Sequence, residues 1–284
     1  MESFLKNFES LGDNCEFGFF LQEQEMNETS LFRWAAIVDY ASVAPAIEAR
    51  FDGIYQLRNL VPQTDSLVRD LAFGGIAFHT DMPIIEHDGM LKFATSEEDR
   101  SELHAKEQSK FRYLAEKFRL VLEHESRIYV VKQEYVPAET DDATSLLETL
   151  RRHGDASVLQ VVVTTKARNV GKVKRIAPHH YIGYIDRFAG AQFPHSINFD
   201  AWATICSNAW SLHSASTRGL RGWISHFSKS LGASDDSLTT DDYVPKWFDP
   251  QLYLRANPDV AAAGFDALDH YKKYGRAEGR PLRP

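Results

Sequence analysis

Apolar residues recur with helical spacing over one long stretch near the middle of the chain. Between Ser96 and Glu123 they are separated by three, four, seven or eight positions, as on the buried face of an amphipathic helix. Ser96 is followed by the acidic residues Glu98 and Asp99, a combination typical of a helix N-terminus. The pattern therefore predicts that residues 96–123 form the long helix of the domain.

The segments that follow alternate between strand and helix patterns. We expect a strand at Arg127 to Lys132, a helix at Asp141 to His153 closed by Gly154, and a strand at Val158 to Thr164. This order, with largely apolar strands, is typical of a parallel crossover unit. The sequence therefore predicts an α/β or α+β fold in which helices flank a central mixed, partly parallel sheet.

Shorter apolar segments predict the other elements of the large domain. Pro45 interrupts one helical segment or marks its first turn, and Gly74-Gly75 marks a bend between two strands. The expected elements are a strand ending within 8–12, helices from 13 to about 24 and within 38–50, two strands within 67–79, strands at 172–177 and 181–186, and a helix at 199–212.

The C-terminal part of the chain differs in composition. Residues 231–245 are rich in Ser, Asp and Thr with little to bury, which is typical of a linker. Beyond them, Asp249-Pro250 and Asn257-Pro258 each place a capping residue before a proline at a first helical position. We therefore predict a domain at 1–230, a linker at 231–245 and a small all-α module at 246–284.

Charge and hydropathy exclude some classes of function. The formal net charge of −8 argues against nucleic acid as a partner, because neutralising phosphates needs a surplus of Lys and Arg on one face. The apolar runs are far shorter than the ~20 residues that cross a bilayer, and the N-terminus lacks a basic start followed by an apolar segment. We expect a cytoplasmic protein without a transmembrane segment.

Metal and cofactor motifs are missing from the sequence. Cys15 and Cys206 are too few for a disulfide framework and lack a CxxC partner, so both are expected to be free thiols. The adjacent His179 and His180 would point to opposite faces of a strand, which disfavours a metal site. Without a Walker loop or a G-x-G-x-x-G sequence, we expect no metal and no cofactor.

Cys15 is the best candidate for chemistry. The run Asp13 to Glu16 has the spacing of a helix start, with Asp13 as the N-cap residue and Glu16 three positions later. A thiol in the first turn would face unpaired N–H groups and the positive end of the helix dipole, which both favour the thiolate. The alternative is a small buried residue that fills a strand–helix junction.

A resemblance strengthens the first interpretation. The stretch SLGDNCEFG at residues 10–18, followed by LFRW at 31–34, resembles the opening of a bacterial family of papain-like cysteine peptidases of unknown function. The similarity continues at GIAFHTD, residues 75–81, and covers roughly residues 8–165. Two positions depart from the family pattern, because Arg33 replaces an acid and Thr80 separates His79 from the acid that follows. The predicted parallel crossover also fits poorly with a papain-type core.

The resemblance implies roles for particular residues. Cys15 would be the nucleophile, His79 the general base and Asp81 the group that orients the imidazole. Asp81 lies two residues beyond His79, so on a strand both side chains would point to the same face. The other positions expected to contact the substrate are Asp13, Asn14, Arg33 and Trp34.

The tail carries a second resemblance. Residues 248–260 and 270–280 resemble a short module attached to bacterial glycosyltransferases and surface-polysaccharide proteins. This similarity implies a context of polysaccharide biosynthesis, in which the tail recruits the enzyme to glycosyltransferase machinery. A simple stabilising cap is the alternative.

Three hypotheses follow. The leading one is a cysteine-dependent hydrolase or acyltransferase that acts on a small-molecule, glycan or peptide substrate in a bacterial surface-polysaccharide context. The second is a non-catalytic binding or scaffold protein in which Cys15 only packs. The third is a glycosyltransferase-like, sugar-modifying enzyme that uses carboxylates such as Asp13, Asp81 and Asp186. A distance below about 4 Å between the Cys15 thiol and the His79 ring would favour the first.

Overall fold

The computed structural model divides into two compact units, residues 1–215 and 216–284. The predicted linker at 231–245 lies outside the described residues, so that boundary stays a prediction. The described residues are 2–37, 40–132, 140–190, 196–229, 248–262, 265–272 and 280–283.

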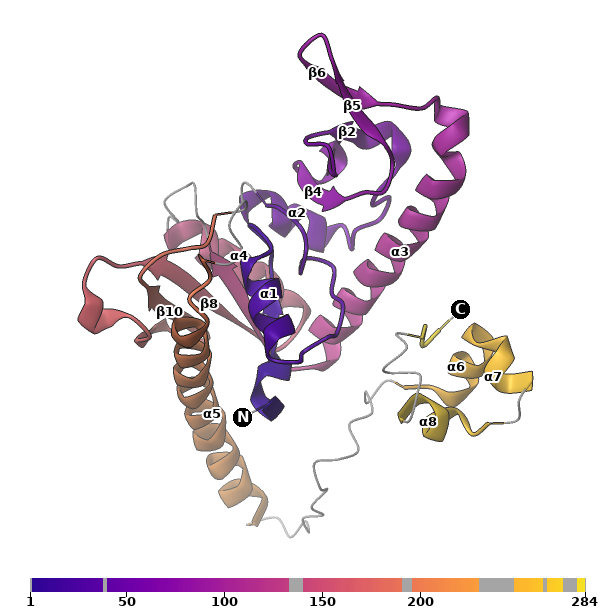
Figure 1. Cartoon of the computed structure of the whole chain (residues 1–284). Helices are drawn as coiled ribbons and strands as arrows, with labels where there is room; N and C mark the ends of the chain where they lie inside the picture. Colours follow the sequence, from indigo (N-terminus) through magenta and orange to yellow (C-terminus); the bar gives the residue numbers. More distant parts are fainter. Residues whose placement is uncertain are drawn as a thin grey trace. The chain divides into compact units, whose positions relative to one another are not determined.

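A five-stranded mixed sheet forms the centre of the first unit (Figure 1). Four neighbouring strands run parallel and the edge strand β9 runs antiparallel to β10, which confirms the predicted fold class. In sheet order the strands are β1 (Phe8–Ser10), β7 (Arg127–Lys132), β8 (Ala156–Val163), β10 (His180–Ile185) and β9 (Val173–Ala177).

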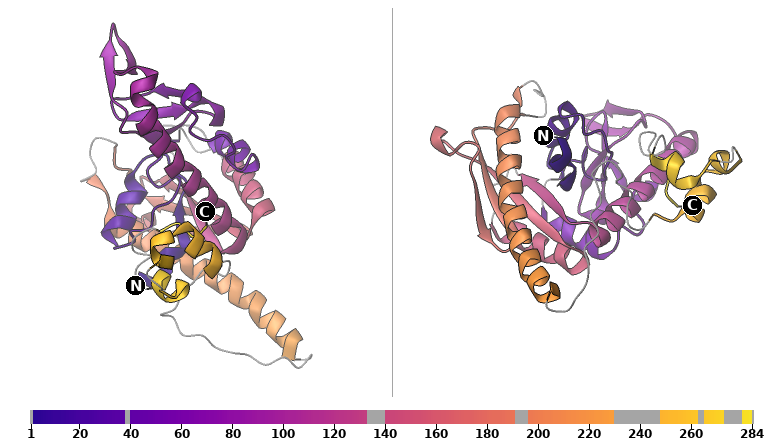
Figure 2. Two further views of the ribbon diagram at one scale, coloured as in Figure 1. Left: turned by 90° about the vertical axis from the view of Figure 1, so that its right-hand side faces the viewer. Right: turned by 90° about the horizontal axis from the view of Figure 1, so that it is seen from below.

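Alternating residues of the central strands feed two hydrophobic cores. From β7, Tyr129 and Val131 pack with helices on one face, whereas Ile128 and Val130 pack with helices on the other. Figures 1 and 2 show that the first turns of the helix α5 (Phe199–Lys229) lie beside the large sheet, next to β8 and β10 in Figure 1. The first face is covered by α2 (Val43–Glu48), α3 (Glu97–His124) and α4 (Thr140–His153), and the second by α1 (Glu16–Glu23) and α5 (Phe199–Lys229).

Two smaller sheets lie toward the start of α3, which runs from them to the large sheet (Figure 1). The three-stranded antiparallel sheet contains β2 (Leu60–Pro62), β3 (Leu67–Asp70) and β4 (Ile76–His79). A hairpin of β5 (Ile84–His87) and β6 (Met90–Phe93) forms the other. Short 3₁₀ helices complete the unit: η1 (Glu2–Asn7), η2 (Tyr40–Ser42), η3 (Leu57–Asn59), η4 (Leu71–Phe73) and η5 (Ala167–Asn169).

Most predicted elements are confirmed to within a few residues. The long helix, the strand at 127–132 and the bend at Gly74-Gly75 all occur where the pattern places them. The last helix continues to Lys229, well beyond the predicted end at residue 212. The hairpin at 84–93 was not predicted. Most of its side chains are exposed, but Asp88-Gly89, both with positive φ angles, is a two-residue turn that could have indicated it.

The second unit contains the expected short helices, α6 (Pro250–Ala256), α7 (Pro258–Ala262) and α8 (Ala267–His270). The Asp249 carboxylate caps α6 by accepting hydrogen bonds from the first turn. A small core surrounds Tyr253, whose hydroxyl lies 2.9 Å from His270 Nδ1. Within the described residues of both units, no helix has the length and apolar character needed to cross a membrane.

Candidate active site

Cys15 lies in a sharp turn between β1 and α1, at the carboxyl edge of the parallel strands. Gly12 and Asp13 have φ angles of 91° and 81°, in the left-handed region. Two left-handed residues cannot begin a helix, so α1 starts at Glu16 with Cys15 as the N-cap residue. The predicted N-cap role of Asp13 is therefore wrong. Ligand sites of open α/β sheets form at this edge.

Residues 35–37 connect the three-stranded sheet to the Cys15 turn. Ala36 exchanges two main-chain hydrogen bonds with Ala77 on β4, both 2.9 Å long. The same segment lies against Gly12, where an added Cβ would be 2.7 Å from Cδ1 of Ile37. The bare glycine therefore permits the close approach that carries His79, two residues beyond Ala77, toward Cys15.

Cys15 and His79 meet at hydrogen-bonding distance. Cys15 Sγ lies 3.7 Å from His79 Nε2, and because His79 is exposed the pair is open to solvent. A hydrogen bond with the main chain of Ser66 raises the pKa of the same imidazole. Because Nε2 faces the thiol, a ring that donates to Ser66 through Nδ1 would leave Nε2 able to accept a proton. The structure thus brings together the predicted nucleophile and base.

Asp81 is not the group that orients this imidazole. Its side chain is exposed, and the described hydrogen bonds include none between its carboxylate and His79. Its main-chain N–H instead donates to Glu107 Oε1 at 2.6 Å. The hydrogen-bond partner of the His79 imidazole is instead the main chain of Ser66, which directly precedes β3.

Burial sets the protonation states of the pair. It raises the pKa of the Cys15 thiol above its ordinary value, and the positive charge of Lys132 opposes this rise. Partial loss of solvent contact, reinforced by the positive charge of Lys110, lowers the pKa of the exposed His79, while a hydrogen bond with the main chain of Ser66 raises it. At neutral pH the pair is therefore a neutral thiol beside a neutral imidazole. The thiolate expected from the helix position is therefore not the favoured form of Cys15 at neutral pH.

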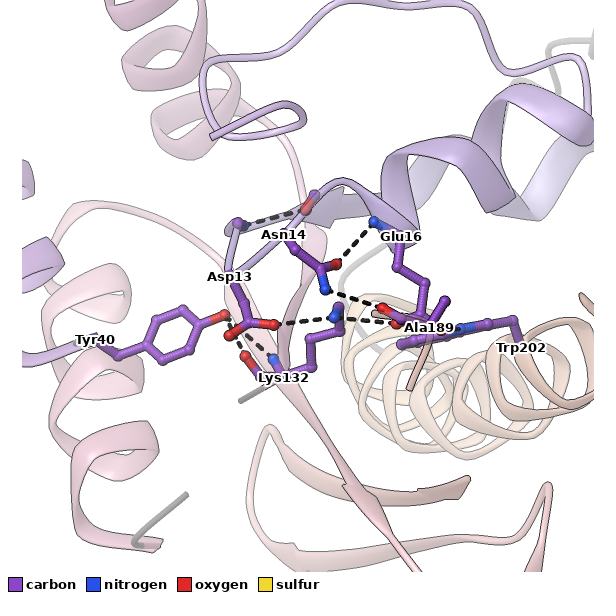
Figure 3. A network of polar contacts seen from close by, with 9 residues as sticks. Asp13, Asn14, Glu16, Tyr40, Lys132, Ala189 and Trp202 are labelled. Atoms are coloured by element: carbon purple, nitrogen blue, oxygen red, sulfur yellow. Dashed lines mark hydrogen bonds and ion pairs between the residues drawn. The ribbon is translucent and has the colours of Figure 1, made fainter. Parts of the chain in front are cut away.

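A buried group of charges lies under the turn, which we call the Lys132 cluster: Lys132, Asp13 and Glu16. The ammonium of Lys132 lies 2.9 Å from Asp13 Oδ2 and 3.0 Å from Glu16 Oε2 (Figure 3). The exposed fractions of the three side chains are 1%, 6% and 1%. Trp202 Nε1 donates to Glu16 at 2.9 Å, and Tyr40 OH donates to the main-chain carbonyl of Lys132 at 2.9 Å. The cluster therefore ties the Cys15 turn to β7 and α5.

The other predicted substrate-binding residues also make internal contacts. Asn14 is buried, with Nδ2 donating to the Ala189 carbonyl at 3.3 Å and Oδ1 accepting from Glu16 N at 2.9 Å. Arg33 is 4% exposed and donates to main-chain carbonyls of Glu28 and Gly18. Its guanidinium lies over the ring of Trp34. Asp13, Asn14 and Arg33 thus hold the local backbone, whereas Trp34 remains partly accessible.

Arg33 also lines a small cavity together with Glu9 and Arg127. Neither Cys15 nor His79 belongs to its lining. Elsewhere, the Asp186 carboxylate of the third hypothesis is paired with Arg187 at 2.5 Å and accepts from Asn198 at 2.8 Å. Over the described part of the chain, His, Cys, Asp and Glu side chains form no group of three suited to a metal ion.

Sequence patterns missed three residues of the site. Lys132 directly follows the apolar run Ile128 to Val131 of its strand, and a charge at the carboxyl end of a parallel strand was a usable indication. Glu107 lies on the apolar face of the long helix, four residues before Phe111. A charged residue on such a face was a second usable indication. Ser66 acts through its main chain, so its residue type carried no such information.

Comparison with known proteins gives no match. No family model, no curated protein and no solved structure matches this chain. The case for cysteine chemistry therefore rests on the geometry of Cys15 and His79.

Proposed function

We propose that this protein is a cysteine-dependent hydrolase or acyltransferase. In the proposed reaction, Cys15 attacks a carbonyl carbon while His79 Nε2 takes the thiol proton. The imidazolium then gives that proton to the leaving group, and a thioester on Cys15 remains. Water resolves the thioester in a hydrolase, and another nucleophile resolves it in a transferase. The observation that carries this proposal is the distance of 3.7 Å between Cys15 Sγ and His79 Nε2.

Two further features support this assignment. A hydrogen bond from Nδ1 to the main chain of Ser66 would favour the tautomer that a general base needs. The strained strand–turn–helix at Gly12 and Asp13 presents the thiol at the carboxyl edge of the sheet. Backbone strain is often found at functional sites, where surrounding contacts maintain it.

The substrate class follows from the sequence resemblances. We propose a glycan- or peptide-linked acyl group, handled in the bacterial cytoplasm during surface-polysaccharide synthesis, with residues 246–284 as the part that recruits partner glycosyltransferases. An acyltransferase fits this context at least as well as a peptidase. The polysaccharide context is supported by residues 248–260 and 270–280 alone.

An activated ester tests the cysteine chemistry without knowledge of the substrate. With p-nitrophenyl acetate, Cys15 should form an acetyl thioester that neutral hydroxylamine cleaves, detected by peptide mass mapping. Cys206 serves as an internal control, because it is fully buried and burial raises the pKa of its thiol. His79→Ala should slow acylation about 10²- to 10⁴-fold, the range of general-base catalysis.

His87→Ala is the matched control for that variant, because His87 is an exposed histidine on the β5–β6 hairpin. It should leave the acylation rate unchanged. Equal rates for wild type and His79→Ala, or label that avoids Cys15, would refute the proposal and favour a binding or scaffold protein. Comparing acetate release with acetyl transfer to an added glycan then separates hydrolase from transferase.

A further inference from the structure

Glu107 is a buried carboxylate on the apolar face of α3. Its exposed fraction is 7%, and it lies on the same helix face as Phe111 and Leu114, which belong to the core. Burying a carboxylate is unfavourable unless hydrogen bonds compensate for the lost water. The partners of Glu107 therefore indicate what the side chain is for.

Three donors converge on this carboxylate, and two of them directly follow His79. Thr80 Oγ1 donates to Oε2 at 2.9 Å, and the main-chain N–H of Asp81 donates to Oε1 at 2.6 Å. The third donor is the hydroxyl of Tyr55, 2.8 Å from Oε2. Glu107 thus fixes the chain immediately after the candidate base, where β4 ends.

The carboxylate is itself held in place through Tyr55. The Tyr55 ring stacks on Phe111 with 4.3 Å between centroids. The Tyr55 carbonyl accepts hydrogen bonds from His104 and Gln108, both on α3, at 2.9 and 3.2 Å. These contacts join the start of the small sheet to the long helix. Tyr55 is thus held against α3, and its hydroxyl fixes the position of the Glu107 carboxylate.

The segment after His79 is also hydrogen-bonded to Ser66, the residue that directly precedes β3. Thr80 N donates to the Ser66 carbonyl at 3.1 Å, and the main chain of the same residue hydrogen-bonds the His79 ring. The Thr80 hydroxyl also accepts a hydrogen bond from Met82 N at 3.0 Å. Thr80 is thus fixed by main-chain and side-chain contacts together, and a shift of this residue would displace the Ser66 main chain that hydrogen-bonds the imidazole.

We propose that Glu107 is a positioning residue for His79. By clamping Thr80 and Asp81, it keeps the Ser66 carbonyl and the imidazole in register, so that Nε2 faces the Cys15 thiol. The inference rests on the proposed cysteine chemistry, but it concerns the orientation of the ring, which can be measured without any reaction. Glu107 is buried and hydrogen-bonds the two residues after His79, so it would act on the reaction only through that chain.

Glu107→Gln and Thr80→Val are the test variants. Glutamine keeps the shape of Glu107 but removes its charge. If the amide oxygen accepts from Asp81 N, the amide nitrogen faces the Tyr55 and Thr80 hydroxyls, which must turn from donating to accepting. Valine removes the hydroxyl of Thr80, whereas Thr80→Ser retains it. Glu102→Gln is the matched control, because Glu102 is an exposed residue of the same helix. Misplacing the base should slow acylation of Cys15 roughly 10- to 100-fold in both test variants, and neither control should change it.

Two measurements separate positioning from a general structural effect. In the His79→Ala background, Glu107→Gln should cause no further loss of rate, because Glu107 acts only through His79; a further loss would contradict the proposal. Nitrogen NMR shifts of His79 should report a single Nδ1–H tautomer in wild type and Thr80→Ser, and a mixture in Glu107→Gln and Thr80→Val.

An unchanged tautomer in both test variants would refute the positioning role, even if wild type proved unreactive toward the ester. Conversely, an unreactive wild type with a shifted tautomer in the variants would support positioning and refute the cysteine chemistry. Should Glu107→Gln fail to fold, Thr80→Val and Thr80→Ser give the same comparison at a partly exposed residue.

Discussion

Removing the cation of the Lys132 cluster should destabilise the first unit strongly. Lys132→Met keeps most of the aliphatic stem but leaves the carboxylates of Asp13 and Glu16 buried without the ammonium they share. Two charge-assisted contacts, at 2.9 and 3.0 Å, are lost. Each such contact contributes about 1.5–3 kcal/mol, and breaking a buried ion pair from one side costs about 3–5 kcal/mol. We therefore expect a loss of about 3–5 kcal/mol in the free energy of unfolding.

This loss should depend on pH with a definite sign. Without Lys132, two ionised carboxylates lie buried side by side with no counter-charge. Acid supplies protons that neutralise this charge, so the variant should gain stability relative to wild type as pH falls. The difference between wild type and Lys132→Met should therefore be smaller at pH 5 than at pH 8.

Urea unfolding followed by tryptophan fluorescence measures this difference, since Trp202 is buried and hydrogen-bonded to Glu16. Lys106→Met is the control, because Lys106 is an exposed residue of α3 and its loss should change stability by less than about 0.5 kcal/mol. Adding Glu16→Gln to Lys132→Met removes one of the two buried carboxylate charges that lack a counter-charge. The double variant should therefore recover part of the lost free energy of unfolding. A cost below about 1 kcal/mol at pH 8, or one that does not shrink at pH 5, would refute the argument.

Two further predictions concern the turn and the dyad. Because burial holds the pKa of His79 below its ordinary 6.5 and raises that of Cys15 above its ordinary 9.0, the acylation rate should stay level from pH 7 to pH 8 and fall only below pH 6.5; an acid limb centred above pH 7 would contradict this assignment. Gly12→Ala should cost about 2–5 kcal/mol in urea unfolding and slow acylation, since it adds a clash with Ile37 to the strain of a left-handed alanine. Gly89→Ala is the control, because Gly89 has a φ of 74° but open space around an added Cβ, so this variant has only the backbone strain. It should cost only about 1–2 kcal/mol in urea unfolding and should leave the acylation rate unchanged.

Apolar patterning predicted the large sheet well because its central strands β7 and β8 are buried on both faces. The strand at 127–132 and the helices beside it have patterns that follow directly from burial. Local chemistry served less well at the Cys15 turn. Asp13 has the residue type and spacing of an N-cap, but its carboxylate pairs with Lys132, 119 residues away in sequence. A tertiary ion pair overrode a local capping preference.

The candidate site was predictable only in part for the same reason. Cys15 and His79 came from a motif resemblance, yet their contact spans two sheets and depends on the pairing of Ala36 with Ala77. The choice of Asp81 followed from strand alternation, which is a sound rule within a strand. Asp81, however, lies two residues past the end of β4, where the chain turns so that its N–H can reach Glu107.

The two members of the dyad stand on different sheets, and each is supported by its own buried charge. The Lys132 cluster holds the turn that carries Cys15, and Glu107 holds the chain that follows His79. Buried charges contribute little net stability, because desolvation offsets much of their attraction, but they permit few alternative geometries. An apolar core would stabilise both sheets as well without fixing an S···N distance. The placement of buried charge beside both the thiol and the imidazole is therefore better explained by a need for a fixed relative position than by a need for stability, and the proposed cysteine catalysis would require such a position.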